Sequence, residues 1–101
     1  MSKESEAATE QKIKNKGLVA PRLCPADIDA VIVDKTFTNL PSGKCMICEI
    51  TLKNGYIVRG ESACVSPANF NEEIGRDISF EDARKKIWGL EGYLLQERNP
   101  V

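Results

Sequence analysis

A chain of 101 residues with fourteen basic side chains, fifteen acidic ones and no histidine excludes several classes of function. The net charge of -1 provides no overall field that would recruit nucleic acid in general or an anionic membrane surface, and no apolar run is long enough to span a bilayer. Histidine is the commonest general base and the commonest transition-metal ligand, so its absence argues against an enzyme built on such groups.

The N-terminal segment is polar and shows no apolar periodicity over its first ten residues. We therefore expect residues 1–10 to form a mobile N-terminus and residues 11–101 to form a single domain. The segment also lacks the apolar stretch of a secretory signal, which predicts a cytoplasmic protein with reduced cysteines.

Helical signals continue on both sides of a short connector. Residues 11–17 have the length of one or two helical turns ended by a glycine, and an extended connector follows as far as Cys24. Pro25 suits a first helical position, and helical spacing is shared by Ile28, Val31 and Ile32. A short helix over residues 25–33 is the prediction, followed by a short strand over residues 35–38.

Residues 44–63 carry the signature of a β-hairpin. The Asn54-Gly55 dipeptide tolerates positive φ at both positions, as the two-residue type I′ turn requires. In that register Thr51 faces Val58 and Cys45 faces Cys64. Because side chains alternate across a strand, one face then carries Met46, Cys48, Ile50 and Leu52 together with Ile57, Arg59, Glu61 and Ala63.

Neither face of this expected hairpin is cleanly polar. A sheet that is apolar on both sides indicates that one face or an edge meets a ligand or a second copy of the chain. For a second copy, the expected contact residues are Tyr56 and Val58. The alternative is that an N-terminal helix covers one face and a C-terminal helix the other.

The C-terminal third is helical by pattern. Ser66 and Pro67 form a pair suited to an N-cap and a first helical position. Since Gly75 and Ser79 permit a break, we expect two helices, over residues 67–75 and 79–96; the alternative is one helix packed on two sides. Together the elements predict an α+β fold: an antiparallel sheet centred on the hairpin, a short N-terminal helix and C-terminal helices.

The four cysteines do not predict a metal site. Cys45 and Cys48 have a zinc-like spacing, but residues three apart in a strand point to opposite faces. We expect buried thiols with no bound metal, no cofactor and no structural disulfide.

The loop after the second hairpin strand is the candidate ligand site. Polar donors, an aromatic ring and a guanidinium gather around the expected helix start, where free N–H groups favour an anion; they are Ser62, Ser66, Asn69, Phe70 and Arg76. Lys53 and Arg59 on the neighbouring strands add positive charge, and Tyr56 is a second ring for stacking. The plainer interpretation stays open: Ser66 only caps, Phe70 is core, and the polar groups are solvated.

Several segments form a specific pattern along the chain: Gly60-Glu61-Ser62-Ala63, Asn69-Phe70, Glu73-Ile74-Gly75-Arg76, Lys86-Ile87-Trp88 and Leu90-Glu91-Gly92-Tyr93. With these segments the chain resembles a family of small phage proteins, the gene-forty-nine/gene-sixty-six family of tailed phages and prophages. It implies a small accessory phage protein that acts in the cytoplasm of the infected bacterial host, without assigned chemistry for these residues.

The expected outline is also similar to that of phage anti-defence sponges, which are small oligomers that sequester nucleotide signals of host immunity. Our leading hypothesis is thus a non-enzymatic homo-oligomer that captures a small phosphate-bearing ligand of the cyclic nucleotide or cyclic ADP-ribose type. The alternative is a protein–protein inhibitor or assembly factor that uses a sheet edge against a host target.

Overall fold

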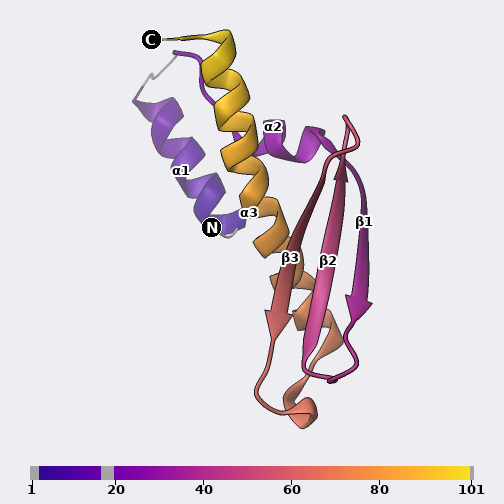
Figure 1. Ribbon diagram of the computed structural model, residues 1–101. Coiled ribbons are helices and arrows are strands. Elements are labelled where there is room, and N and C mark those ends of the chain that lie inside the picture. Colours follow the sequence, from indigo (N-terminus) through magenta and orange to yellow (C-terminus); the bar gives the residue numbers. More distant parts are fainter. Residues whose placement is uncertain (1–2, 17–19, 101) are drawn as a thin grey trace.

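The computed structural model describes residues 3–16 and 20–100. Three strands form one antiparallel sheet in the order β1-β2-β3, and α3 crosses one face of this sheet (Figure 1). The elements in chain order are α1 (Lys3–Asn15), α2 (Pro25–Ala30), β1 (Ile32–Asn39), β2 (Cys45–Leu52), β3 (Ile57–Ala63), the 3₁₀ turn η1 (Pro67–Asn69) and α3 (Glu72–Arg98). The predicted α+β class is confirmed. None of the described helices combines the length and the apolar character needed to traverse a bilayer.

The β2–β3 hairpin turns through three residues rather than two. The amide of Gly55 donates to the carbonyl of Leu52 at 2.8 Å, and Gly55 is the turn residue with positive φ, at 89°. Asn54 therefore does not take the left-handed conformation that a type I′ turn demands; the loop is a type I turn closed by a left-handed glycine. The expected two-residue turn was wrong, and with it the register.

A register shift of one residue exchanges the two faces of β3. Ile50 pairs with Val58 and Cys45 pairs with Ala63, so Cys45 does not lie opposite Cys64. Burial alternates cleanly along both strands. The inner face carries Met46, Cys48, Ile50, Leu52, Val58, Gly60 and Ser62, all of them buried. The expected grouping of Ile57, Arg59, Glu61 and Ala63 with the core residues is corrected: they are exposed on the outer face.

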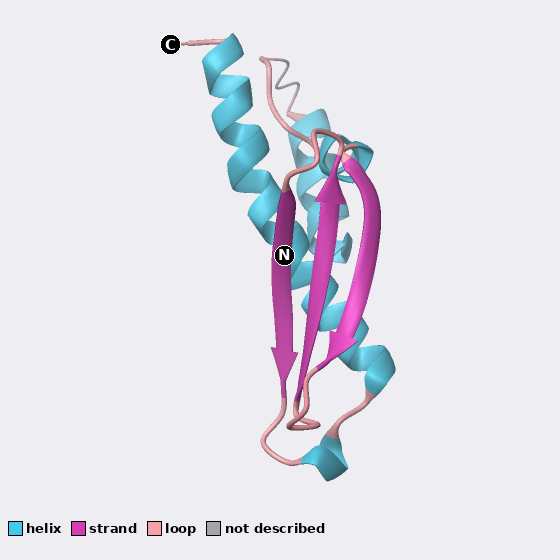
Figure 2. Cartoon of the chain, turned by 45° about the vertical axis from the view of Figure 1, so that its right-hand side comes forward, coloured by secondary structure: helices cyan, strands magenta, loops and turns pink. Residues whose placement is uncertain are grey.

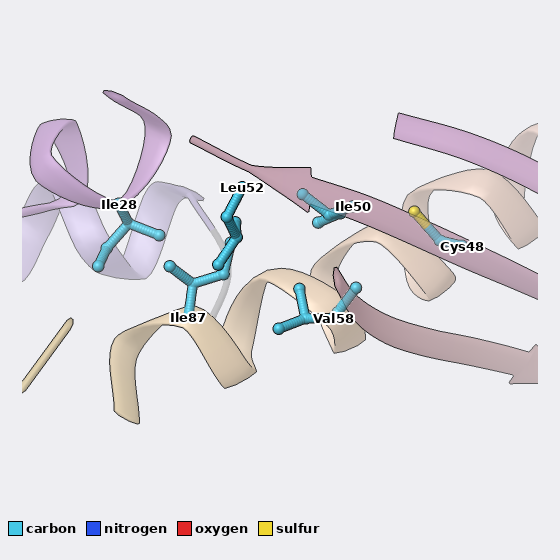
Figure 3. Packing of buried hydrophobic residues seen from close by; sticks show 7 residues of the cluster. Ile28, Cys48, Ile50, Leu52, Val58 and Ile87 are labelled. Carbon is cyan, nitrogen blue, oxygen red and sulfur yellow. The ribbon is translucent and has the colours of Figure 1, made fainter. Parts of the chain in front are cut away.

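The core lies between this inner face and α3. Ile50, Leu52 and Val58 from the sheet pack with Ile87 from α3, and Ile28 of α2 closes one end (Figure 3). Ile28 and Ile87 are fully buried. Among the described elements, all helices lie on the same side of the sheet, so its outer face is uncovered (Figure 2). The alternative in which an N-terminal helix covers that second face does not hold.

Helix α3 is a single helix of 27 residues, which was the second of the two arrangements considered from the sequence. No break occurs at Ser79, because its hydroxyl donates to the carbonyl of Arg76 at 3.3 Å and is thus satisfied inside the helix. The expected helix over residues 67–75 is replaced by the short η1 turn, since Phe70 has extended backbone angles. Asn71 then caps α3, its side chain accepting from the amide of Ile74 at 3.0 Å.

Small residues bring α3 unusually close to the sheet. Gly75, Ser79 and Ala83 recur every four residues on the buried face of the helix. A Cβ built on Gly60 of β3 would lie 2.1 Å from the backbone nitrogen of Ala83 and 2.3 Å from the carbonyl oxygen of Ser79. Helix backbone and strand backbone thus meet at Gly60 with no side chain between them.

The N-terminal elements differ in extent from expectation. Helix α1 begins at Lys3, eight residues before the expected start at Gln11, and its ion pairs with the rest of the chain account for this extension. Helix α2 ends at Ala30 because the chain enters β1 at Ile32, so β1 is longer than the expected residues 35–38. Pro25 occupies the start of α2 as predicted.

The carboxylate of Asp27 accepts hydrogen bonds from both the backbone amide and the thiol of Cys24. These hydrogen bonds, the one from the amide above all, lower the pKa of Asp27.

Candidate functional site

The residues predicted for ligand binding fall into three regions. Ser66, Asn69 and Phe70 lie in and beside η1, and Arg76 lies in the second turn of α3. Arg59 is on the outer face of β3, and Tyr56 stands at the β2–β3 turn, at the opposite end of the sheet from η1 (Figure 1). Tyr56 and the η1 residues therefore do not contribute to one pocket.

Ser66 caps η1 rather than an α-helix. Its hydroxyl oxygen accepts from the amide of Ala68 at 3.3 Å, and η1 contains three residues. The long helix whose dipole would attract an anion starts at Glu72. The helix start predicted after Ser66 is therefore five residues further along the chain.

Acidic side chains already occupy the positive end of α3. Glu72 and Glu73 lie in its first turn, where carboxylates match the helix dipole. Arg76 pairs with Glu72 at 3.6 Å, and its guanidinium lies over the ring of Phe37, 5.9 Å from the ring centre. The positive charge of Arg76 is thus shared with a carboxylate and a ring of the protein itself.

Ser62 is buried beneath the start of α3. A Cβ built on Gly75 would meet the Ser62 hydroxyl oxygen at 3.3 Å and the ring of Phe70 at 3.4 Å, so both side chains lie close to Gly75. Within the described part of the chain, the Ser62 hydroxyl has no hydrogen-bond partner. At 7% exposure it lies beneath the surface, whereas Asn69 and Arg76 are exposed.

Side chains of α3 occupy the outer edge of β3. The amine of Lys86 donates to the carbonyl of Arg59, and the carboxylate of Asp82 accepts from the amide of Glu61 at 3.0 Å. These two backbone groups would otherwise be free at the edge of the sheet. Arg59 thus takes part in the structure through its backbone.

An apolar groove of about 680 Å³ lies between the β2–β3 turn and the C-terminal half of α3. Of the residues proposed from the sequence for ligand binding, Tyr56 and Lys53 line it. The groove is formed by Val31, Leu52, Lys53, Asn54, Tyr56, Gly89, Leu90, Glu91, Tyr93, Leu94 and Arg98. We refer to these residues as the tyrosine groove.

The tyrosine groove exists because α3 is longer than the sheet that it covers. The helix face that packs on the sheet through Ala83 and Ile87 continues through Leu90 and Leu94 at the same helical spacing. There the helix has passed the end of the strands (Figure 1). Leu94 is 44% exposed and Tyr93 is 69% exposed. The apolar stripe of α3 therefore extends beyond the strands, where no part of the sheet buries it.

The charged groups of the tyrosine groove are two cations and one carboxylate. Lys53 approaches from the hairpin turn, Arg98 from the last turn of α3, and Glu91 from the same helix. Tyr56 is 57% exposed, so both phenol rings are accessible to a ligand. Apolar walls, two aromatic rings and two cations are suited to a planar ligand that carries negative charge.

The cysteines lie apart from the groove. Cys48 is fully buried in the core, and this burial raises the pKa of its thiol. Cys45 lies on the other face of β2, as expected for residues three apart in a strand. In the residues that the structure describes, the metal-ligating side chains form no group of three or more.

Comparison with known protein families gives one match. The family model described as "Phage protein (N4 Gp49/phage Sf6 gene 66) family" matches residues 23–99. No curated protein and no solved structure matches the chain significantly. The matched segment contains α2, the sheet and all of α3, and it leaves out α1.

Proposed function

The chain belongs to the phage protein (N4 Gp49/phage Sf6 gene 66) family, and from this premise we propose that it is a non-enzymatic accessory protein that sequesters a small phosphate-bearing ligand. The ligand class is that of cyclic nucleotides or cyclic ADP-ribose, the signals of bacterial immunity. The observation that carries the proposal is the tyrosine groove, whose two exposed rings and two cations match a base and a phosphate.

The dimensions and chemistry of the groove support this choice. Its volume of about 680 Å³ lies within the roughly 300–1,000 Å³ that small-molecule sites occupy. Tyr56 and Tyr93 offer ring faces for stacking, and Lys53 and Arg98 offer charge for a phosphate. The cluster around η1 is a poorer phosphate site, because Glu72 and Glu73 lie at the start of α3 and would repel an anion.

Loss of the Tyr93 ring tests the groove. Base–aromatic stacking contributes about 1–3 kcal/mol per base, so Tyr93→Ala should weaken ligand binding by roughly 5- to 150-fold. Titration calorimetry against cyclic dinucleotides, cyclic trinucleotides and cyclic ADP-ribose isomers measures the effect. Because Tyr93 is exposed, the variant should keep the stability of the wild type, which urea denaturation checks.

Variants at the other predicted residues distinguish the tyrosine groove from the start of α3 as the place where the ligand binds. Asn69→Ala and Arg76→Ala should leave the affinity within about twofold of wild type if the ligand lies in the groove. Loss of affinity in these variants, with Tyr93→Ala unchanged, would move the site to the start of α3. If folded wild-type protein binds no member of the panel, ligand sequestration is rejected and the alternative function of an inhibitor or assembly factor acting on a host protein takes its place.

The uncovered stripe of α3 also supports the expected homo-oligomer. The contact residues proposed from the sequence were Tyr56 and Val58, but Val58 is 5% exposed and belongs to the core. The contact surface that we propose instead consists of Tyr56, Leu90, Tyr93 and Leu94. A second copy packed on this surface would also close the groove over a bound ligand.

Sedimentation velocity tests the oligomer. We expect wild-type protein to sediment as a dimer or larger at micromolar concentration and Leu94→Glu to sediment as a monomer, because a charge in the apolar contact opposes association. Ile78→Glu is the matched control: Ile78 is also exposed on α3 but lies toward the opposite side of the helix. A wild type that is monomeric throughout this range would contradict the proposal.

A further inference from the structure

A second site with ligand-binding chemistry lies around Arg84, away from the tyrosine groove. Arg84 is 1% exposed. Its guanidinium donates to Glu6 at 2.6 Å, to Asp29 at 2.9 Å and to the carbonyl of Pro25 at 3.5 Å. Burial by itself would lower the pKa of Arg84, but the hydrogen bonds to Glu6 and Asp29 outweigh it and raise the pKa. The guanidinium is therefore a fixed cation inside the protein.

Helix α1 carries two carboxylates one helical turn apart, and each pairs with an arginine outside α1. Glu10 accepts from both terminal nitrogens of Arg22, at 2.6 and 3.1 Å, and Glu6 accepts from Arg84. Along residues 5–15 Glu6 is buried, Glu10 and Ile13 are half-buried, and the other side chains are exposed. Two ion pairs, rather than an apolar face, thus attach α1 to the rest of the protein.

The contact between Glu6 and Arg84 is loosely enclosed. A cavity of about 390 Å³ is lined by the pair together with Glu81, Lys85 and Trp88. A second cavity of about 490 Å³, lined by residues of α1 and α2, also borders Glu6 and Arg84. The guanidinium therefore has space next to it that α1 does not fill.

The segment matched by the family model includes Arg84 but not its ion-pair partner Glu6. Arg84, Asp29 and Pro25 lie within residues 23–99, whereas Glu6 lies outside them. The guanidinium nitrogen that donates to Glu6 has no other hydrogen-bond partner among the described residues, so α1 supplies the oxyanion at this position. We propose that Arg84 is the centre of an oxyanion-binding site for a phosphate or carboxylate group, and that Glu6 occupies this site as a competitor built into the same chain.

Removal of the competing charge in the full chain tests the proposal. Glu6→Gln keeps the shape of the side chain but lowers its affinity for the guanidinium. Thermal melting is compared in chloride, phosphate and acetate at equal ionic strength. Phosphate or acetate should raise the melting temperature of Glu6→Gln by at least about 4 °C more than it raises that of the wild type, and the more effective anion identifies the preferred group.

Glu97→Gln is the control for general salt effects, because Glu97 is an exposed carboxylate on α3. Its response to the three anions should equal that of the wild type. In the wild type, phosphate should also speed hydrogen exchange in α1 relative to chloride, because the anion displaces Glu6. Equal anion responses in Glu6→Gln and Glu97→Gln, or α1 exchange that no anion accelerates, would overturn the proposal.

Discussion

Replacing Gly60 by alanine is expected to lower the free energy of unfolding by about 3 kcal/mol. A Cβ at this position would lie 2.1 Å from the backbone nitrogen of Ala83. Neither partner can move alone, because both belong to backbones held by helix or sheet hydrogen bonds. The helix must then move away from the sheet, which opens the core between Ile87 and Val58. Urea denaturation followed by circular dichroism measures the loss.

Gly89→Ala is the matched control for this substitution. A Cβ on Gly89 would have nothing within 4 Å, and alanine favours a helix over glycine by up to about 1 kcal/mol. The same chemical change should therefore destabilise the protein at position 60 and stabilise it slightly at position 89. If Gly60→Ala costs less than about 1 kcal/mol, the close packing of α3 on β3 is not as described.

Replacing Arg84 by methionine is expected to cost about 3 kcal/mol of folding stability, the lower end of the range for breaking a buried ion pair. Methionine keeps much of the side-chain volume but leaves the 3%-exposed Glu6 without its cation. The expected loss of folding stability is at the lower end of this range because α1 can detach and expose Glu6 to water. Urea denaturation measures the effect, and proteolysis within residues 3–15 reports whether α1 has left its site.

Arg22→Met provides the comparison on the same helix. The Arg22–Glu10 pair is partly exposed, at 31% and 18%, and such pairs contribute about 1 kcal/mol or less. We expect a cost below about 1 kcal/mol for this variant. Equal losses for Arg22→Met and Arg84→Met would show that burial does not set the strength of these ion pairs.

The fold class could be predicted from the sequence, but the register could not. Asn54-Gly55 marks a hairpin correctly, yet the same dipeptide fits a two-residue loop and the end of a three-residue loop. The burial pattern distinguishes the two, because only the three-residue loop puts Val58 on the same face as Ile50. The local turn preference of Asn54-Gly55 favoured the two-residue loop, whereas packing of the sheet against α3 determined the register.

Packing also explains why one long helix replaced two. Gly75 and Ser79 weaken a helix in isolation, and from the sequence they indicated a break. In the folded protein they are the residues that let α3 approach β3. Likewise α1 shows little apolar pattern, so its length could not be anticipated. Its carboxylates find their cations only once Arg22 and Arg84 are brought together by the fold.

Of the residues proposed from the sequence, Tyr56 and Lys53 line the groove, and the groove residues on α3 follow from the length of that helix. A helix of 27 residues is about 40 Å long, whereas a strand of eight residues spans about 26 Å. Such a helix must extend beyond its sheet, and its apolar residues there, Leu90 and Leu94, have no strand to cover them. Dividing the helix in two concealed this difference in length.

The side chains of Lys86 and Asp82 on the edge of β3 limit how copies of this chain can aggregate. A sheet with two open edges can add strands on both sides and grow without end. Here the β3 edge is occupied at Arg59 and Glu61, which leaves β1 as the edge along which a strand of another copy could pair. Pairing through one edge joins two sheets about a two-fold axis and then stops. Pairing of sheet edges between copies is thus expected to favour closed pairs over fibres.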